Sequence, residues 1–196
     1  MSGQGDEDVL VGGADDDRLN GGDGSDLLIG GSGNDEYRLL ASDGDDQADR
    51  IEDADGSADT IAFEEGIAIV AMAADGDYLE IEFNQSSVLL IKDHYGAGTI
   101  ETLTYDFGDG SRTYNLSTSH NTGTSGDDII IGSIGAADSV IAGDGDDVLF
   151  GQSDSGEVLS GGVGNDLLFS GGIVDAMTGG SGDDTFTYRG RLSRPR

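Results

Sequence analysis

The chain has 196 residues, with 35 glycines, 40 acidic residues and nine Lys or Arg, and its formal net charge is −31 at pH 7. Because nucleic acids, anionic membranes and acidic polysaccharides each require positive charge on a protein partner, this balance argues against all three. The chain has no cysteine and therefore no disulfide framework. No apolar run approaches the roughly 18 residues of a membrane-spanning helix, and no hydrophobic signal segment precedes the first motif.

A nonapeptide repeat fills the N-terminal part of the chain. Residues 21–29 read GGDGSDLLI and residues 30–38 read GGSGNDEYR, and both fit G-G-x-G-x-D-x-U-x, where U is a large apolar residue. Two looser copies precede them from residue 3, in which Asp6 and Asp15 replace the fourth-position glycine. Asp enters the left-handed backbone region at modest cost, so we expect these loops to keep the same conformation.

Each position of the repeat meets one physical demand. Glycines at positions one, two and four allow positive φ and bring backbone carbonyls close to a cation, where a Cβ would intrude. These carbonyls and the sixth-position carboxylate are hard oxygen ligands, which suit calcium with its roughly six to eight oxygens better than zinc. The eighth residue points inward from a short strand. Two nonapeptides then make one coil, and successive loops lie on opposite edges.

The segment between residues 39 and 122 has a different character. Its acidic start still echoes the repeat at residues 49–51 and 59–61, so a continuation of the coils by two ion-poor half-coils is one alternative. Residues 79–83 and 100–105 alternate and residues 88–91 form an apolar run typical of a buried strand, with turn residues between them. We expect a small antiparallel β domain here, with a last strand near residues 112–116 and no helix.

A second repeat block of seven units follows, with clean copies such as GGVGNDLLF at residues 161–169 and GGSGDDTFT at residues 179–187. Its odd-numbered loops have the glycines that calcium needs, whereas its even-numbered loops depart from the pattern, for example with Ile173 in a glycine position. The acidic residues of these even-numbered loops are Asp138, Glu157 and Asp175. We therefore expect metal along only one edge of this block.

The pattern also predicts the core and the ligands. The inward residues are Leu10, Leu19, Leu28, Tyr37, Ile130, Val140, Leu149, Leu159, Leu168, Met177 and Phe186, and the two aromatic ones are expected to close the end of each block. The predicted metal ligands are the carboxylates of Asp8, Asp17, Asp26, Asp35, Asp128, Asp147, Asp166 and Asp184, with the loop glycines Gly22, Gly24, Gly31, Gly33, Gly126, Gly143, Gly145, Gly162, Gly164, Gly180 and Gly182.

The number of sites follows from the position of each ion between loops that are two apart in sequence. The first block then offers two sites, which pair Asp8 with Asp26 and Asp17 with Asp35. The second block offers three, which pair Asp128 with Asp147, Asp147 with Asp166 and Asp166 with Asp184. We expect about five calcium sites in all, and we expect the metal-free chain to be expanded by its own charge.

The repeats resemble the RTX repeat region of haemolysin-type calcium-binding proteins, which Gram-negative bacteria export by type I secretion. Both blocks carry the motif, and DTIAFEEGI, LEIEF, VLLIKDHY and IETLTYDFGDGS of the middle segment resemble the domain that flanks such repeats. The resemblance covers the chain to about residue 188. It implies right-handed parallel β-rolls, calcium-induced folding outside the cell, the type I secretion machinery as a partner, and a longer extracellular parent such as a toxin, protease, lipase or adhesin.

The expected architecture is therefore all-β, with two right-handed parallel β-rolls joined by a small antiparallel β domain. The first roll covers residues 3–38, or extends to residue 63 if the half-coils belong to it. The antiparallel domain covers residues 64–121 and the second roll residues 122–188. A disordered basic tail, RGRLSRPR, covers residues 189–196.

Three other interpretations compete with a calcium-binding module. A disordered Gly/Asp-rich tract explains neither the period nor the inward aliphatic residues, although a single sixth-position Asp could also be an ordinary turn residue. An adhesive or polysaccharide-binding module is the alternative function. An enzyme built on the middle segment is not expected, because His94 and His120 are the only histidines and no serine lies in a nucleophile motif.

Overall fold

The computed structural model of the protein describes residues 1–40, 48–53, 58–64, 66–75, 78–83, 87–92, 94, 100–105, 112–116, 121–132, 139–152, 156–171 and 176–188. Every regular element in these ranges is a β-strand, which confirms the all-β prediction. The chain divides into two compact units, Met1–Thr113 and Tyr114–Arg196. The predicted tail and the residues Asp138, Ile173, Asp175 and His120 lie outside the described ranges.

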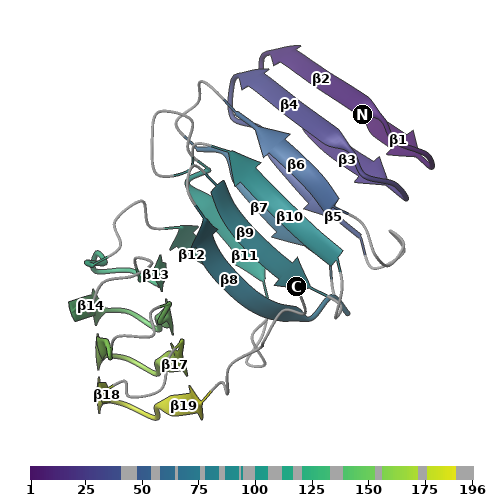
Figure 1. The fold of residues 1–196 in the computed structure, drawn as a ribbon. Helices are drawn as coiled ribbons and strands as arrows, with labels where there is room; N and C mark the ends of the chain where they lie inside the picture. The colour runs from purple at the N-terminus through teal and green to yellow at the C-terminus, as the bar shows by residue number, and fades with distance from the viewer. Residues whose placement is uncertain are drawn as a thin grey trace. The chain divides into compact units, whose positions relative to one another are not determined.

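The first unit is a parallel β-solenoid in which alternate strands form two faces (Figure 1). One face contains, in spatial order, β1 (Ser2–Gln4), β3 (Arg18–Gly22), β5 (Glu36–Leu39), β7 (Thr60–Phe63) and β11 (Thr102–Tyr105). The other contains β2 (Val9–Ala14), β4 (Leu27–Ser32), β6 (Ala48–Glu52) and β10 (Ser87–Lys92). Leu10 of β2 pairs with Leu28 of β4, so two nonapeptides make one coil, as predicted.

The middle segment adds strands to both faces of this solenoid. On one face, β8 (Ile69–Asp75) and β9 (Tyr78–Phe83) pair antiparallel with each other, and β9 pairs antiparallel with β10. On the other face, β11 pairs parallel with β7. The apolar run in β10 is not buried throughout, because Ser87, Leu89 and Ile91 point inward while the residues between them are partly exposed. Pairing within a sheet leaves a strand with two faces, and here only one of them meets the core.

The second unit is a shorter stack of the same kind. One face contains β13 (Asp128–Ile131), β15 (Val148–Phe150), β17 (Leu167–Ser170) and β19 (Thr185–Tyr188), and residues 115–116 of β12 (Arg112–Leu116) pair with β13. The other face contains β14 (Ser139–Asp144), β16 (Val158–Val163) and β18 (Ala176–Ser181). All of these pairs are parallel.

The eighth-position residues form the core of both units. Nine of the eleven predicted inward residues are at most 7% exposed, and Met177 packs partly buried against the core of the second unit. Phe186 lies in β19, the last strand of its face, and is 42% exposed, so the prediction that it closes the second roll stays a prediction. The same prediction is wrong for Tyr37, which is fully buried because β6 and β7 continue the stack beyond it.

The glycines of the loops have two different roles. Among the described loops, the glycines at positions two and four have positive φ except Gly126, as at Gly162 (128°) and Gly164 (141°), and Asp6 and Asp15 adopt φ values of 75° and 72° as predicted. The expectation of positive φ at position one is wrong for the described loops. Position one is crowded instead: a Cβ at Gly161 would collide with the carboxylate of Asp166 from the same loop, although Ala142 occupies this position in the loop of Asp147.

Two alanine substitutions test whether positive φ is what requires glycine at position four. Gly164→Ala should lower the free energy of unfolding by roughly 1–3 kcal/mol, because the left-handed conformation is costly for a residue with a Cβ and this Cβ would collide with the Gly145 carbonyl. Gly126→Ala is the matched control, since Gly126 has no positive φ and its added Cβ would find its nearest neighbour at 3.5 Å. Urea unfolding in calcium should show the difference, and equal losses for the two variants would contradict it.

Candidate metal centre

The sixth-position aspartates lie where each loop ends and the next strand begins. In the first unit the loops alternate between two edges, so Asp8 and Asp26 share one edge while Asp17 and Asp35 share the other. This follows from the coil of two nonapeptides, which returns the chain to the same edge after 18 residues. Each loop therefore stacks on the loop of the preceding coil.

One hydrogen bond repeats along every such stack. The backbone N–H of each sixth-position residue donates to the Oδ1 atom of the sixth-position aspartate one coil later, at 2.8 Å from Asp8 to Asp26 and 2.8 Å from Asp17 to Asp35. The second unit repeats it between Asp128 and Asp147 (2.9 Å), Asp147 and Asp166 (3.0 Å), and Asp166 and Asp184 (3.1 Å). We call this series the Asp ladder. It joins all five predicted ligand pairs.

The ladder uses only part of each carboxylate. Within the described part of the chain, one carboxylate oxygen has no hydrogen-bond partner although it is buried in Asp8, Asp35, Asp128, Asp147 and Asp166. A buried carboxylate oxygen without a partner is costly, and a cation is the ligand that would relieve that cost. In Asp35, Asp147 and Asp166 the unpartnered atom is Oδ2, the one that does not serve the ladder. The candidate metal ligands are therefore oxygens, from the aspartate carboxylates and from the backbone carbonyls of the loops, and calcium prefers oxygen ligands.

The electrostatics of the metal-free loops also favour a cation. The pKa of the Asp147 carboxyl is raised to about 7, first by burial and then by the charges of Asp166 and Asp128, against the hydrogen bond from the Asp128 N–H. Burial likewise raises the pKa of Asp166 and that of Asp35. Stacked carboxylates in a desolvated loop resist ionisation unless a positive charge lies between them.

A second ladder, which the sequence pattern did not reveal, involves position five of the loops. Asp127 accepts a hydrogen bond from the backbone N–H of Asp146 (2.8 Å), Asp146 accepts from Asn165 (2.6 Å), and Asn165 accepts from Asp183 (2.9 Å). In the first unit, Asp16 accepts from the N–H of Asn34 at 2.9 Å. This position-five ladder has the opposite direction to the Asp ladder, because here the earlier coil supplies the side chain. The signal in the sequence is that the fifth residue of these loops is Asp or Asn.

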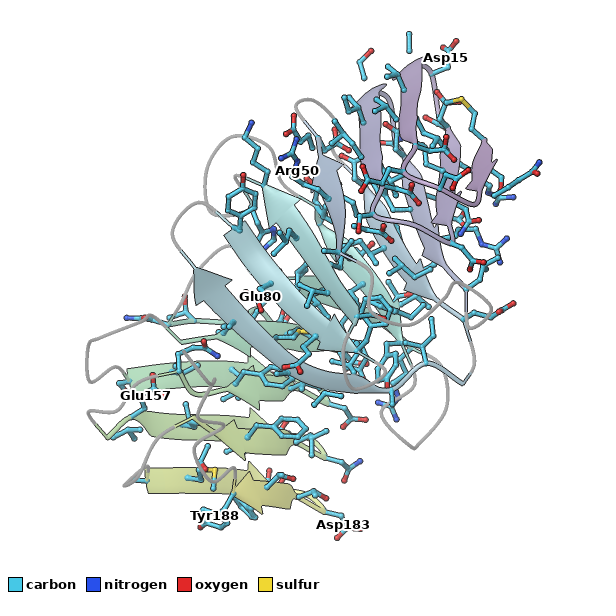
Figure 2. The ribbon with its side chains drawn as sticks, turned by 45° about the vertical axis from the view of Figure 1, so that its right-hand side comes forward. Asp15, Arg50, Glu80, Glu157, Asp183 and Tyr188 are labelled. Atoms are coloured by element: carbon cyan, nitrogen blue, oxygen red, sulfur yellow. The ribbon has the colours of Figure 1, made fainter. Side chains whose placement is uncertain are left out.

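The other edge of the second unit differs. Of its three acidic residues only Glu157 is described, and it is 1% exposed and accepts a hydrogen bond from the Gln152 N–H at 2.8 Å. Figure 2 shows Glu157 at the opposite end of the strands from Asp183, the position-five residue of the last loop on the Asp ladder edge. The prediction that metal binds along one edge of this block therefore stays a prediction.

The Asp ladder of the first unit extends into loops that lack the glycine pattern. Asp26 donates its backbone N–H to Asp49 Oδ1 at 2.9 Å, and Asp35 donates to Asp59 Oδ1 at 2.7 Å. Asp59 in turn donates to Glu101 Oε2 at 2.7 Å. The sequence showed the echo at residues 49–51 and 59–61, but Glu101 lies far along the chain and had no motif to identify it.

Two further residues bear on the chemistry of the first unit. Tyr37 donates its hydroxyl to Asp53 Oδ2 at 2.6 Å, and burial together with this bond raises the pKa of the hydroxyl, so it remains a donor. His94 is fully buried, as a packing residue would be.

Among the described residues, no helix is long and apolar enough to cross a membrane.

The position-five ladder can be tested at Asp146, which both accepts from Asn165 and donates to Asp127 through its backbone. Asp146→Ala removes the side-chain acceptor and should cost about 1 kcal/mol of unfolding free energy, the usual net value of one hydrogen bond. Asp146→Asn should retain the stability, since Asn165 fills the same role one coil later. Denaturant unfolding of both variants in saturating calcium measures this, and an equal loss in both would show that charge rather than hydrogen bonding matters.

Comparison with known proteins agrees with this geometry. A family model described as the RTX calcium-binding nonapeptide repeat, four copies long, matches residues 2–37, 122–157 and 152–186, together more than half of the chain. Among curated proteins, none matches the chain in sequence.

Among solved structures, the extracellular lipase LipA from Serratia marcescens is similar at 17% identity with a TM-score of 0.19. That alignment covers 93% of this chain and 31% of the lipase chain, so the chain spans about a third of the length of that protein. The family match rests on the same loops that form the Asp ladder. The chain belongs to the family of RTX calcium-binding nonapeptide repeat proteins.

Proposed function

We propose that this chain is the calcium-binding repeat module of a larger secreted bacterial protein, which is expanded without Ca²⁺ and folds into its solenoid when it meets Ca²⁺ outside the cell. The observation that carries the proposal is the set of buried carboxylate oxygens without a partner beside the Asp ladder. In this proposal the module has no catalytic role. Export by type I machinery and an extracellular location are proposed from the family to which the chain belongs.

The charge balance explains why folding would depend on the metal. The chain has 40 acidic and nine basic residues, and folding stacks its aspartates along narrow edges. Each bound Ca²⁺ cancels two negative charges and joins two loops. Because the complete site exists only in the folded state, the free energy of calcium binding adds directly to the free energy of folding.

The proposed ligands are the predicted ones. The carboxylates of Asp8, Asp17, Asp26 and Asp35 would hold two ions in the first unit, and those of Asp128, Asp147, Asp166 and Asp184 would hold three in the second. The loop glycines supply backbone carbonyls, which a Cβ at positions two and four would displace. Magnesium is expected to substitute poorly, because it requires near-octahedral geometry with short bonds and keeps its water.

A calcium titration followed by far-UV circular dichroism tests the proposal. We expect a coil-to-β transition over a narrow range of Ca²⁺ concentration, because a calcium ion that orders one loop, such as that of Asp147 or Asp166, also prepares the next site. Mg²⁺ at the same ionic strength is the control and should leave most of the chain unfolded. A spectrum that is already that of β-structure in chelator would show that the apolar core suffices, and would contradict calcium-induced folding.

The same titration on single variants tests the pairing of loops. Asp147→Ala and Asp166→Ala should raise the calcium midpoint most, because each aspartate has a ladder partner on both sides. Asp184→Ala should raise it less, because Asp184 has one such partner, Asp166. Equal shifts at all three positions would count against shared loops.

The pKa shifts predict opposite pH dependences with and without metal. In calcium-free buffer the folded state holds a proton on Asp147 up to about pH 7, whereas the unfolded chain releases it near pH 4. The folded state then binds more protons, so its stability without calcium should fall as pH rises from 5 to 8. In saturating calcium the aspartates are ionised and stability should not fall over this range.

Far-UV circular dichroism at pH 5 and pH 8 measures both trends. In calcium-free buffer the small folded fraction should be larger at pH 5 than at pH 8, and in saturating calcium the spectrum should not change between the two pH values. The variant Asp147→Asn, which cannot ionise at this position, should show a weaker loss of stability between the two pH values in calcium-free buffer. A folded state that becomes more stable as pH rises in calcium-free buffer would contradict the raised pKa of the Asp147 carboxyl.

A further inference from the structure

A cluster of three carboxylates lies in the first unit where the clean repeats end. Ligand oxygens of Asp35, Asp53 and Asp59 all lie within 4.8 Å of one another. The three residues are 1%, 7% and 1% exposed, so water screens their mutual repulsion poorly. The basic side chains of the neighbouring strands, Arg50 and Lys92, both form ion pairs with Glu52, at 3.0 and 3.6 Å.

Asp53 is not a ligand position of the nonapeptide. The register of β4 and β6 pairs Leu28 with Ile51 and Ile29 with Glu52, so the next step of this register places Asp53 beside Gly30. Gly30 occupies position one of its repeat, where the clean loops have no side chain. Asp53 therefore adds a carboxylate at a point of the coil where the repeat pattern provides none.

The hydroxyl of Tyr37 orients this extra carboxylate. It donates to Asp53 Oδ2 at 2.6 Å, and its oxygen lies against Gly30, where an added Cβ would collide with it. The Oδ2 atom of Asp35 lies against the same face of Gly30. The hydroxyl of Tyr37 and the Asp35 carboxylate therefore meet at one point on this edge.

An independent observation points to a ligand in this cluster. Asp35 Oδ1 accepts the backbone N–H of Asp17 at 2.8 Å, but Asp35 Oδ2 is buried with no hydrogen-bond partner among the described residues. Asp59 Oδ1 accepts the backbone N–H of Asp35 at 2.7 Å, which holds the third carboxylate in place. The cluster is thus fixed by hydrogen bonds from the backbone and from Tyr37, while the buried Oδ2 atom of Asp35 has no hydrogen-bond partner among the described residues.

We propose that Asp35, Asp53 and Asp59 form a calcium site outside the nonapeptide pattern, in which the Tyr37 hydroxyl positions Asp53. Two oxygens on opposite sides of a calcium ion are about 4.6–5.2 Å apart and adjacent ones are closer, so the observed spacing lies within one coordination shell. The ion would convert a buried charge of −3 into −1. The site deepens the proposed function and rests on it, since it places one more ion at the end of the first repeat block.

Terbium luminescence tests this site specifically, because Tb³⁺ replaces Ca²⁺ in oxygen-ligand sites and emits when a nearby tyrosine is excited. The signal to measure is the emission of the wild-type chain minus that of Tyr37→Phe, which isolates the contribution of Tyr37 from those of the other tyrosines. We expect a clear difference signal that excess Ca²⁺ abolishes. Asp53→Asn should lower the difference signal, leaving only the part that comes from the repeat ion between Asp17 and Asp35, and should remove about one bound Ca²⁺ per chain in equilibrium dialysis.

The control is Asp128→Asn, which alters a repeat site in the second unit and should leave the Tyr37-dependent emission intact. Absence of a difference signal in a chain that folds with calcium would overturn this site alone, and this result does not depend on whether Asp53→Asn folds. An unchanged ion count in a folded Asp53→Asn variant would also overturn it. Failure of the wild-type chain to bind calcium at all would instead overturn the proposed function.

Discussion

The structure depends on one hydrogen bond, the one in which a sixth-position carboxylate accepts the backbone N–H of the coil before it. This bond fixes the carboxylate with one oxygen in use, and in Asp35, Asp147 and Asp166 it leaves the other oxygen buried and without a hydrogen-bond partner. A side chain held in this way is ordered by the fold itself, so within a folded loop the cation has no further side chain to order. The bond joins the same two coils as the parallel pairing of the adjoining strands, as between β15 and β17.

The glycine pattern is the steric condition for this bond. Glycines at positions two and four turn the loop through positive φ, and glycine at position one leaves room for the carboxylate of its own loop. These are two separate demands. Position one is Gly or, in the loop of Asp147, Ala142, whereas Asp53 places a carboxylate there in a sequence that departs from the glycine pattern. Substituting the first-position glycine in a clean loop would move the aspartate rather than strain the backbone.

Much of this architecture could be predicted from the sequence, because the period of nine determines which residues point inward and which loops share an edge. Leu19 and Leu149 are fully buried as predicted, and the pairs Asp17 with Asp35 and Asp147 with Asp166 meet as the count of loops requires. The pattern could not show where a roll ends. Tyr37 fits the last clean repeat, but Ile51 and Ile61 have the same inward position without the glycines and continue the stack.

The position-five ladder and the role of Glu101 were also beyond the sequence. Position five is written as x in the consensus because Asp, Asn and Ser all serve there, each offering an oxygen to a backbone N–H, so its preference for these residues does not stand out from the pattern alone. Glu101 reaches Asp59 across 42 residues, and a contact of that separation follows from the fold and not from local spacing. Long-range pairing of this kind becomes visible only once the strands are placed.

The coil of two nonapeptides also constrains how the length of such a chain can change. Between nonapeptide loops, each bond of the two ladders joins a loop to the loop one coil away, 18 or 19 residues along the chain. Inserting or deleting a whole coil would leave all other contacts as they are. Inserting a single nonapeptide would shift every later loop to the opposite edge, which would exchange the two faces and, in the second unit, set intact loops beside degenerate ones. The number of units in this chain can therefore vary freely only in steps of two.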